Sequence, residues 1–257
     1  MLQRGIRRLG RRLGGGDPIA ELFARLGGTG TWVDPLAGQT VFSDTAGTTQ
    51  AVQDGLVARI DAAGGVQASF QNATASQQPL LRADGLEFDG VDDRLVYPDD
   101  PALRFGLTDF TIAFACRPDT VTGNHDIWSK RGSGGAGASP GWGLWQSGAN
   151  LILKFDDGTS FGVIVAPGVF AVGAWLSGLV TIDRAAGTAT ARIGGTDFSP
   201  VAIPAGDISG TLPLVIGAGP GGVTPLLGRT GRLLVIDRLL SAQDKATVEA
   251  WLQAGFA

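Results

Sequence analysis

The stretch GLEFDGVDDRLV, residues 85–96, decides the fold class of this chain. Leu86 and Phe88 alternate with polar or small neighbours, and an Asp-Gly pair then separates them from a second apolar run, which predicts a strand, a tight turn and another strand. The stretch GRLLVIDRLLS, residues 231–241, predicts a last strand that runs into a capped helix. Between the two, short apolar runs are broken by glycine and aspartate, which is typical of an antiparallel sandwich. We therefore expect an all-β protein whose function resides in a binding surface rather than in a catalytic pocket.

Alternation of apolar and polar side chains continues through the middle of the chain. Residues 110–117 place Phe110, Ile112, Phe114 and Cys116 on one face of a strand. Residues 151–156 repeat the pattern before an Asp-Gly turn at 157–158. Residues 61–79 are rich in Ala, Gln, Gly, Ser and Asn, which indicates an exposed, weakly structured loop. Residues 241–254 predict a helix with Ser241 as its cap, Asp244 at the capping-box position and an inward stripe of Val248, Trp251 and Leu252.

Composition bounds the class of protein. The 257 residues include 41 glycines, and 44% of the chain is hydrophobic, enough for one large domain with at most a small appendage. The single cysteine, Cys116, excludes an internal disulfide and is expected to be buried. No run of eighteen apolar residues is present, so we expect no membrane span. No apolar stretch of signal-peptide length follows the basic start, so we expect cytoplasmic synthesis without a signal peptide.

The first sixteen residues form a basic arm with five positive charges and no acid. Because the whole chain carries −4, the remainder carries about −9 (−4 minus 5). The arginines are Arg4, Arg7, Arg8, Arg11 and Arg12. Asp17-Pro18 predicts the start of a short helix that ends at Gly27-Gly28. We divide the chain into an arm for attachment or oligomerisation at 1–29 and one domain at 30–257.

The arm is expected to bind a partner protein. Arginine pairs with carboxylates through two hydrogen bonds at once, and five arginines without interleaved aromatic residues make a poor reader of specific nucleic acid. A nonspecific nucleic-acid contact, a membrane surface and a solvated tail are the alternatives.

Ordered motifs along the chain resemble a known superfamily. They are GLEFDGVDDRLVY, DFTIAFACRP, IWSKRG, WGLWQSGANLILKFDDG, GAWLSGLVTIDRAAGTATARIGG, LVIGAG and GRTGRLLVIDRLLSAQDKATVEAWL. Together they resemble the concanavalin A-like lectin/glucanase superfamily, and most of all its laminin G-like jelly-roll members. The upstream segment TWVDPLAGQTVFSDTAGTTQAVQDG is similar to the leader before such domains in tailed-phage and gene-transfer-agent virion proteins. The resemblance covers about residues 31–254.

The resemblance implies a jelly-roll sandwich of two curved antiparallel sheets, here with a short N-terminal helical arm and a C-terminal helix. It implies carbohydrate binding on the concave face or rim loops. For virion relatives it implies a head-spike or fibre component on the virion surface that adheres to host-cell or capsular polysaccharide. We expect other virion proteins, a capsid or a spike base, to hold the arm, and we expect a homo-oligomer because single sugar contacts are weak. The alternatives are a purely structural assembly protein and a polysaccharide-depolymerising enzyme.

The residues disfavour the enzyme. Glucanases of the superfamily carry acids at alternate positions of one strand, as Glu-x-Asp-x-x-Glu or Glu-x-Asp-x-Glu. Glu87-Phe88-Asp89 begins like this motif, but Val91 and Asp92 stand where the last glutamate would be. The only histidine, His125, lies in a predicted loop without a nucleophile elbow, so we expect no triad.

Tryptophans near the middle of the chain predict a sugar site. Trp142 and Trp145 lie on opposite faces of one predicted strand, so at most one of them faces a groove. Trp175 and Trp251 are expected in the core, and Trp32 is expected to anchor the leader. The candidate carbohydrate-binding residues are Asn124, His125, Asp126, Trp128, Lys130, Trp142 and Trp145, an aromatic surface with amide, carboxylate and ammonium groups beside it.

Asp89, Asp92 and Asp93 are weak candidates for a calcium site, because carboxylates are hard oxygen ligands and rim loops of relatives hold this ion. The alternative is turn chemistry, with the Asp-Gly pair closing a hairpin and Asp93 paired with Arg94. No other cofactor is expected.

Overall fold

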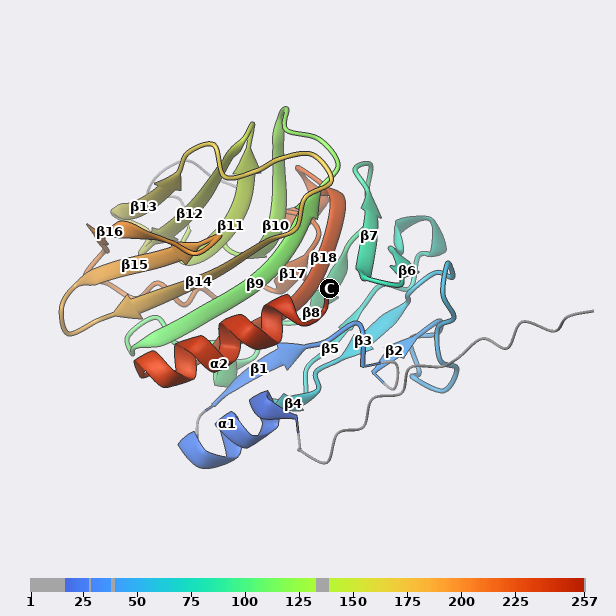
Figure 1. Ribbon diagram of the computed structural model, residues 1–257, viewed down its shortest axis with the longest axis horizontal. Helices are drawn as coiled ribbons and strands as arrows, with labels where there is room; N and C mark the ends of the chain where they lie inside the picture. The colour runs from blue at the N-terminus through green and yellow to red at the C-terminus, as the bar shows by residue number, and fades with distance from the viewer. Residues whose placement is uncertain (1–16, 28, 38–39, 133–138, 257) are drawn as a thin grey trace, which may run out of the picture.

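The protein is an all-β sandwich of two antiparallel sheets, as predicted. The computed structural model describes residues 17–27, 29–37, 40–132 and 139–256, and within them all strand pairs are antiparallel. The two sheets face each other and enclose the main hydrophobic core (Figure 1).

Each sheet has nine strands among the described residues. The first sheet runs in the order β16 (Thr196–Ala202), β15 (Thr188–Ile193), β14 (Leu176–Asp183), β9 (Phe110–Pro118), β18 (Leu227–Ile236), β1 (Gly30–Val33) and β4 (Gly64–Gly65), with β7 (Gly85–Asp89) paired to β18 and to β6 (Leu80–Arg82). The second sheet runs in the order β13 (Phe161–Ala166), β12 (Asn150–Asp156), β11 (Gly141–Ser147), β10 (Asn124–Lys130), β17 (Leu214–Ile216), β8 (Leu95–Tyr97), β5 (Ser69–Gln71), β3 (Arg59–Asp61) and β2 (Val41–Phe42). In the described part of the chain, the helices are α1 (Pro18–Leu26), α2 (Ala242–Gln253) and three short 3₁₀ turns, η1 (Ala75–Gln77), η2 (Pro101–Leu103) and η3 (Pro220–Gly222).

Strand β9 lies at the centre of the first sheet and is buried on both faces. Its larger apolar side chains point into the core between the sheets, which confirms the predicted alternation. Ala113 and Ala115 point the other way and lie in a second cluster beneath the helices. The approach of β14 is close, because a Cβ on Gly178 would lie 2.4 Å from the ring of Phe114.

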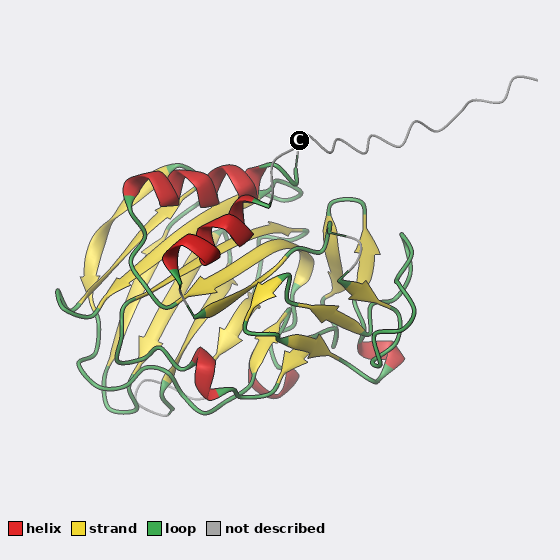
Figure 2. Cartoon of the chain, turned by 90° about the horizontal axis from the view of Figure 1, so that it is seen from below, coloured by secondary structure: helices red, strands yellow, loops and turns green. Residues whose placement is uncertain are grey.

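Both α-helices lie on the outer face of the first sheet, in contact with each other (Figure 2). Helix α2 buries the predicted stripe of Val248, Trp251 and Leu252, and the hydroxyl of Ser241 caps it by accepting a hydrogen bond from the amide of Asp244. Among the described residues, neither helix is long and apolar enough to cross a membrane.

Helix α1 confirms the predicted N-terminal helix. The side chain of Asp17 accepts a hydrogen bond from the amide of Ile19 at 2.9 Å, and Gly27 ends the helix with a left-handed φ of +61°. Phe23 packs on Trp32 of β1 with ring centroids 4.4 Å apart. The arginine arm (Arg4, Arg7, Arg8, Arg11 and Arg12) lies outside the described residues, and the domain division at residue 29 stays a prediction.

The predicted hairpin at residues 85–97 is wrong in its pairing. The two strands exist, but β7 pairs with β18 in the first sheet and β8 pairs with β17 in the second. The Asp-Gly turn therefore carries the chain from one sheet to the other. Phe88 and Leu95 both point into the core between the sheets. The backbone hydrogen bonds of β7 go to β18 and β6, and those of β8 go to β17 and β5, instead of joining β7 to β8.

The loop predicted at residues 61–79 is also wrong. It contains β4, β5 and η1, and Phe70 at its centre is fully buried opposite Ile60 of β3. Its strands are only two or three residues long. β4 pairs with β1, and β5 pairs with β8 as well as with the nearby β3. Part of their hydrogen bonding therefore comes from segments farther along the chain, which local composition does not reveal.

Removing the ring of Phe114 should cost far more stability than removing that of Phe161. Phe114 is fully buried, whereas Phe161 is 50% exposed. Phe114→Ala should lower the free energy of unfolding by about 3–5 kcal/mol, and Phe161→Ala by less than about 1.5 kcal/mol. Urea unfolding followed by tryptophan fluorescence measures both. Equal losses in the two variants would contradict the two-layer core.

Candidate functional site

A pocket lies on the outer face of the second sheet, the face that carries neither α-helix among the described residues. Its volume is about 250 Å³. Val96 of β8 and Val215 of β17 form its floor, because their neighbours along each strand point into the core. We call it the Arg94–Arg131 pocket after the two basic side chains in its wall.

Arg131 is held in place by a buried carboxylate and an aromatic ring. Its guanidinium donates to Oδ1 of Asp126 at 2.9 Å and lies 4.8 Å from the ring centroid of Trp145. Its stem crosses over Gly143, where a Cβ would stand 2.6 Å from Nε. Asp126 is 1% exposed; burial raises the pKa of its carboxyl, and the charge of Arg131 opposes that rise. The ion pair therefore fixes the orientation of Arg131.

The loop that forms another wall of the pocket is tied to the same aspartate. Thr224 has a left-handed φ of +49°, which costs a β-branched residue roughly 1–3 kcal/mol. Its carbonyl accepts from the amide of Asp126 at 2.8 Å, and its hydroxyl donates to the carboxylate of Asp126. Nδ1 of His125 lies 2.7 Å from the carbonyl oxygen of Pro225. These contacts hold the strained loop, and with it Pro220 at the pocket wall.

Arg94 reaches the pocket from the turn between β7 and β8. Its guanidinium donates to the carbonyl of Asp92 at 3.2 Å and packs against Gly222, where a Cβ would lie 2.6 Å from Nη1. Two guanidiniums thus share a pocket whose remaining lining is mostly valine, leucine, proline and glycine. Guanidinium pairs bind carboxylate or sulfate, and an apolar wall accepts the CH face of a sugar ring.

The structure separates the residues predicted to bind sugar. Trp128 and Trp142 are 0% and 3% exposed and pack edge to face at 5.3 Å in the core, so neither offers a face to a ligand. This corrects the prediction for both; the bulge in β10 between Asp126 and Trp128, which turns Trp128 inward, is invisible in the sequence. Trp145 is half-buried on the outer face, opposite to Trp142, as alternation predicted.

Lys130 is also buried, at 1% exposure, and cannot meet a ligand. Its ammonium donates to Asp99 at 2.7 Å and to the carbonyl of Leu212 at 2.9 Å, and burial lowers its pKa. Asp126 and His125 support the pocket from behind, and Asn124 is exposed at the start of β10. Sequence reasoning missed Arg94 and Arg131. Arg131 directly follows Lys130, but nothing in the sequence links it to Arg94.

The acidic turn beside the pocket could hold a cation. Carboxylate oxygens of Asp89, Asp92 and Asp93 lie within 4.8 Å of one another, a spacing that a calcium ion can bridge. The expected pair between Asp93 and Arg94 is not formed among the described residues; Asp93 instead accepts from the amide of Asp89 at 3.0 Å. Burial raises the pKa of Asp93 from 3.8 to about 6, with further contributions from the charges of Asp89 and Asp92.

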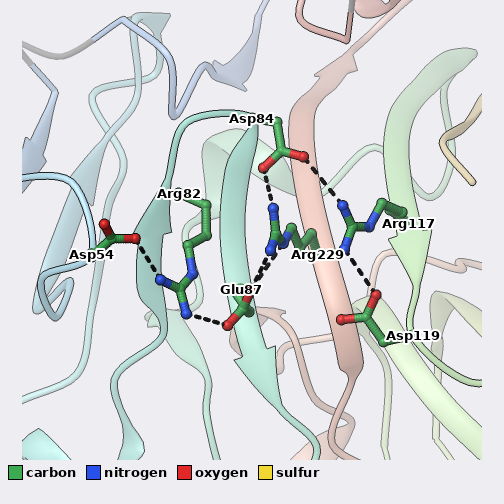
Figure 3. A network of polar contacts seen from close by, with 7 residues as sticks. All are labelled: Asp54, Arg82, Asp84, Glu87, Arg117, Asp119 and Arg229. Atoms are coloured by element: carbon green, nitrogen blue, oxygen red, sulfur yellow. Dashed lines mark hydrogen bonds and ion pairs between the residues drawn. The ribbon is translucent and has the colours of Figure 1, made fainter. Parts of the chain in front are cut away.

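Glu87, the first acid of the incomplete glucanase motif, is neutralised by arginines. It lies between Arg82 and Arg229 on the outer face of the first sheet, in a ladder that continues through Asp84 to Arg117 (Figure 3). The hydrogen bond from Arg82 is the first cause of a lowered pKa for Glu87. A general acid of a glycosidase needs the opposite shift.

Comparison with known proteins places the fold. A laminin G profile, described as the concanavalin A-like lectin/glucanases superfamily, matches residues 89–246, more than half of the chain. No curated protein sequence matches this chain significantly.

Solved structures of toxin domains share the fold. The binding domain of botulinum neurotoxin serotype D is 13% identical with a TM-score of 0.55, covering 74% of this chain and 49% of that domain. A binding domain of botulinum neurotoxin DC in complex with rat synaptotagmin II is 11% identical with a TM-score of 0.57, covering 77% and 49%. A structure of botulinum neurotoxin type C, whose cell entry depends on interaction with two ganglioside molecules, is 13% identical with a TM-score of 0.55, covering 76% of this chain and 49% of that one. The chain spans about half the length of these toxin domains.

Asp93→Asn should stabilise the protein above about pH 6 and not at acidic pH. Because the pKa of Asp93 is raised by folding, its stabilising contribution is present below pH 3.8 and is lost as the pH rises through about 6. Asparagine keeps the acceptor for the amide of Asp89 without the buried charge. The gain in unfolding free energy should be roughly 1–3 kcal/mol at pH 8 and close to zero at pH 4.

Urea unfolding at the two pH values measures this difference, and an equal gain at both would contradict the assignment. Calcium binding is tested with the same pair of proteins. A bound ion raises the melting temperature of the wild type at pH 8 and leaves that of Asp93→Asn unchanged.

Proposed function

The chain belongs to the concanavalin A-like lectin/glucanase superfamily, and we propose that it is a non-catalytic adhesion module that binds an acidic surface polysaccharide in the Arg94–Arg131 pocket. The observation that carries this proposal is the pairing of two guanidiniums in a mostly apolar pocket on the open sheet face. Their charge selects a uronic acid or another anionic sugar, and the valines and prolines receive its ring.

The fixed geometry of the Arg94–Arg131 pocket supports a ligand-binding role over a purely structural role in assembly. The buried Asp126 orients Arg131 and holds the strained Thr224 at the same time. Backbone strain of this kind persists where the surroundings enforce it, and it clusters at ligand sites. A preorganised site loses less entropy when the ligand binds.

We place this module on the surface of a phage-like or gene-transfer-agent particle, as a head-spike or fibre component. The leader similarity of residues 31–55 and the five arginines of the arm support attachment to a capsid or spike-base protein. Weak single-site affinity for a surface polysaccharide favours several copies, so we propose a homo-oligomer. The toxin domains with the same fold are themselves binding domains, which supports an adhesion role.

Arg94→Gln should weaken binding to a uronic-acid polysaccharide by about tenfold or more, because a charge-assisted hydrogen bond contributes roughly 1.5–3 kcal/mol. Arg94 makes no ion pair among the described residues, so its loss should leave the fold intact. Surface-plasmon resonance on the immobilised polysaccharide and on its carboxyl-reduced form measures the effect. The wild type should prefer the acidic form, and the variant should bind both weakly.

Lys245→Gln is the matched control, since it removes the same charge from α2 on the opposite side of the sandwich. The double variant Asp126→Asn with Arg131→Gln tests the second guanidinium without leaving a buried charge unpaired. No retention on any acidic polysaccharide by a multivalent display of the chain would contradict the proposal and leave the structural assembly role. Release of reducing ends from the polysaccharide would contradict the non-catalytic part.

A further inference from the structure

We propose a second, independent binding site for a neutral oligosaccharide, in a trough on the first sheet between α2 and the turn that joins β15 to β16. The trough lies on the opposite side of the sandwich from the Arg94–Arg131 pocket. It consists of two adjoining hollows of about 400 and 90 Å³, which share Ser177, Gly195 and Gln253 in their linings. We call it the α2 trough.

Two stacked aromatic rings form one end of the trough. Trp175 and Phe256 lie with ring centroids 4.0 Å apart and planes 13° from parallel, and both line the larger hollow. The sequence predicted Trp175 in the core, but it is only half-buried. Its ring rests on chain segments without side chains, because Cβ atoms on Gly85 and Gly231 would each lie 3.3 Å from it. An aromatic surface held in this way can receive the CH face of a sugar.

Unused hydrogen-bonding groups stand beside the rings. Ser177 points outward from β14, and Gln253 is exposed in the last turn of α2. Neither the hydroxyl of Ser177 nor the carboxamide of Gln253 bonds to another described residue. Together they supply donors and acceptors at an aromatic wall, the combination that sugar hydroxyls require.

The other end of the trough is closed by an ion pair that links helix to sheet. Arg192 of β15 contacts Glu249 of α2 at 3.1 Å and Asp197 of β16 at 2.7 Å. The arginine charge is therefore compensated, which makes the α2 trough unlike the basic pocket on the second sheet. Its lining favours an uncharged ligand with hydroxyl groups.

The turn between β15 and β16, which forms one side of the α2 trough, consists of glycines without side chains. Gly194 and Gly195 have left-handed φ values of +55° and +81°, and the amide of Gly194 donates to the carbonyl of Ser177 at 2.9 Å. No atom lies within 4 Å of a Cβ placed on Gly195. A ring lying on Trp175 and Phe256 can therefore extend over this turn. Two sites on opposite sheet faces would allow one copy to contact two polysaccharide chains at once.

The test is two-dimensional NMR of the full chain with maltohexaose, cellohexaose and chitohexaose, each at up to about 10 mM, above the millimolar constants expected of a shallow site. At least one of these sugars should shift the indole N–H of Trp175, the side-chain amide of Gln253 and the backbone amide of Gly195. The Trp175→Phe variant assigns the indole signal.

Gln253→Ala and Ser177→Ala should each weaken that sugar about three- to tenfold, as expected for the loss of one hydrogen bond. Gln243→Ala is the matched control, because Gln243 is exposed in the first turn of the same helix, away from the trough. Arg94→Gln should leave these shifts unchanged, so that failure of the acidic site and failure of this one are distinguishable.

Three outcomes would overturn the proposal. They are no shift with any of the three sugars, equal weakening by Gln243→Ala, and shifts of the same signals by a pool of hexapeptides but by none of the sugars. The last result would assign the α2 trough to an extended peptide instead.

Discussion

Strand β9 packs against the core between the sheets with one face and against α2 with the other. The positions of the second sheet and of α2 both depend on this burial. Phe110, Ile112 and Phe114 interlock with the second sheet, while Ala113 and Ala115 are small enough for the helix to lie close. Burial of a phenylalanine side chain stabilises by roughly 1.5–3 kcal/mol, so several such contacts outweigh any single polar interaction of the surface. Because the helices cover the centre of the first sheet, ligand surfaces are left on the second sheet and beside α2.

Buried ion pairs within the second sheet fix the positions of side chains on its outer face. Lys130 and Asp126 are both almost completely buried, and each is compensated, by Asp99 and by Arg131. A buried charge without its partner would cost several kcal/mol, so these pairs restrict the chain to one arrangement at β10. The pair with Asp126 holds Arg131 so that its side chain crosses Gly143 and lines the pocket. Among the residues that were expected to touch sugar, Asp126 and His125 instead hold Arg131 and the pocket wall, and Trp128, Trp142 and Lys130 are buried.

The two proposed sites differ in charge because their arginines differ in how many carboxylate partners they have. On the second sheet, only one of the two guanidiniums of the pocket has a carboxylate partner among the described residues. In the α2 trough, Arg192 is balanced by two carboxylates. The first sheet also carries the arginine–carboxylate ladder around Glu87, which spans β6, β7, β18 and β9 and offsets the repulsion of the directly opposed Arg229 and Arg117. The outer faces of the two sheets therefore differ in charge: the second sheet carries a basic pocket, whereas the arginines named on the first sheet are paired with carboxylates.

The sequence by itself determined the features that depend on neighbours along the chain. Alternation at 110–117, the caps at Asp17 and Ser241 and the inward stripe of α2 follow from the period of a strand or helix and from hydrogen bonds within one turn. Tertiary structure alone decided what depends on distant partners. It placed β7 and β8 in different sheets, paired the short strands of residues 61–79 with β1 and β8, and turned Trp128 inward at a bulge. It also brought Arg94 and Arg131 into one pocket, because packing, and not sequence distance, sets which side chains meet.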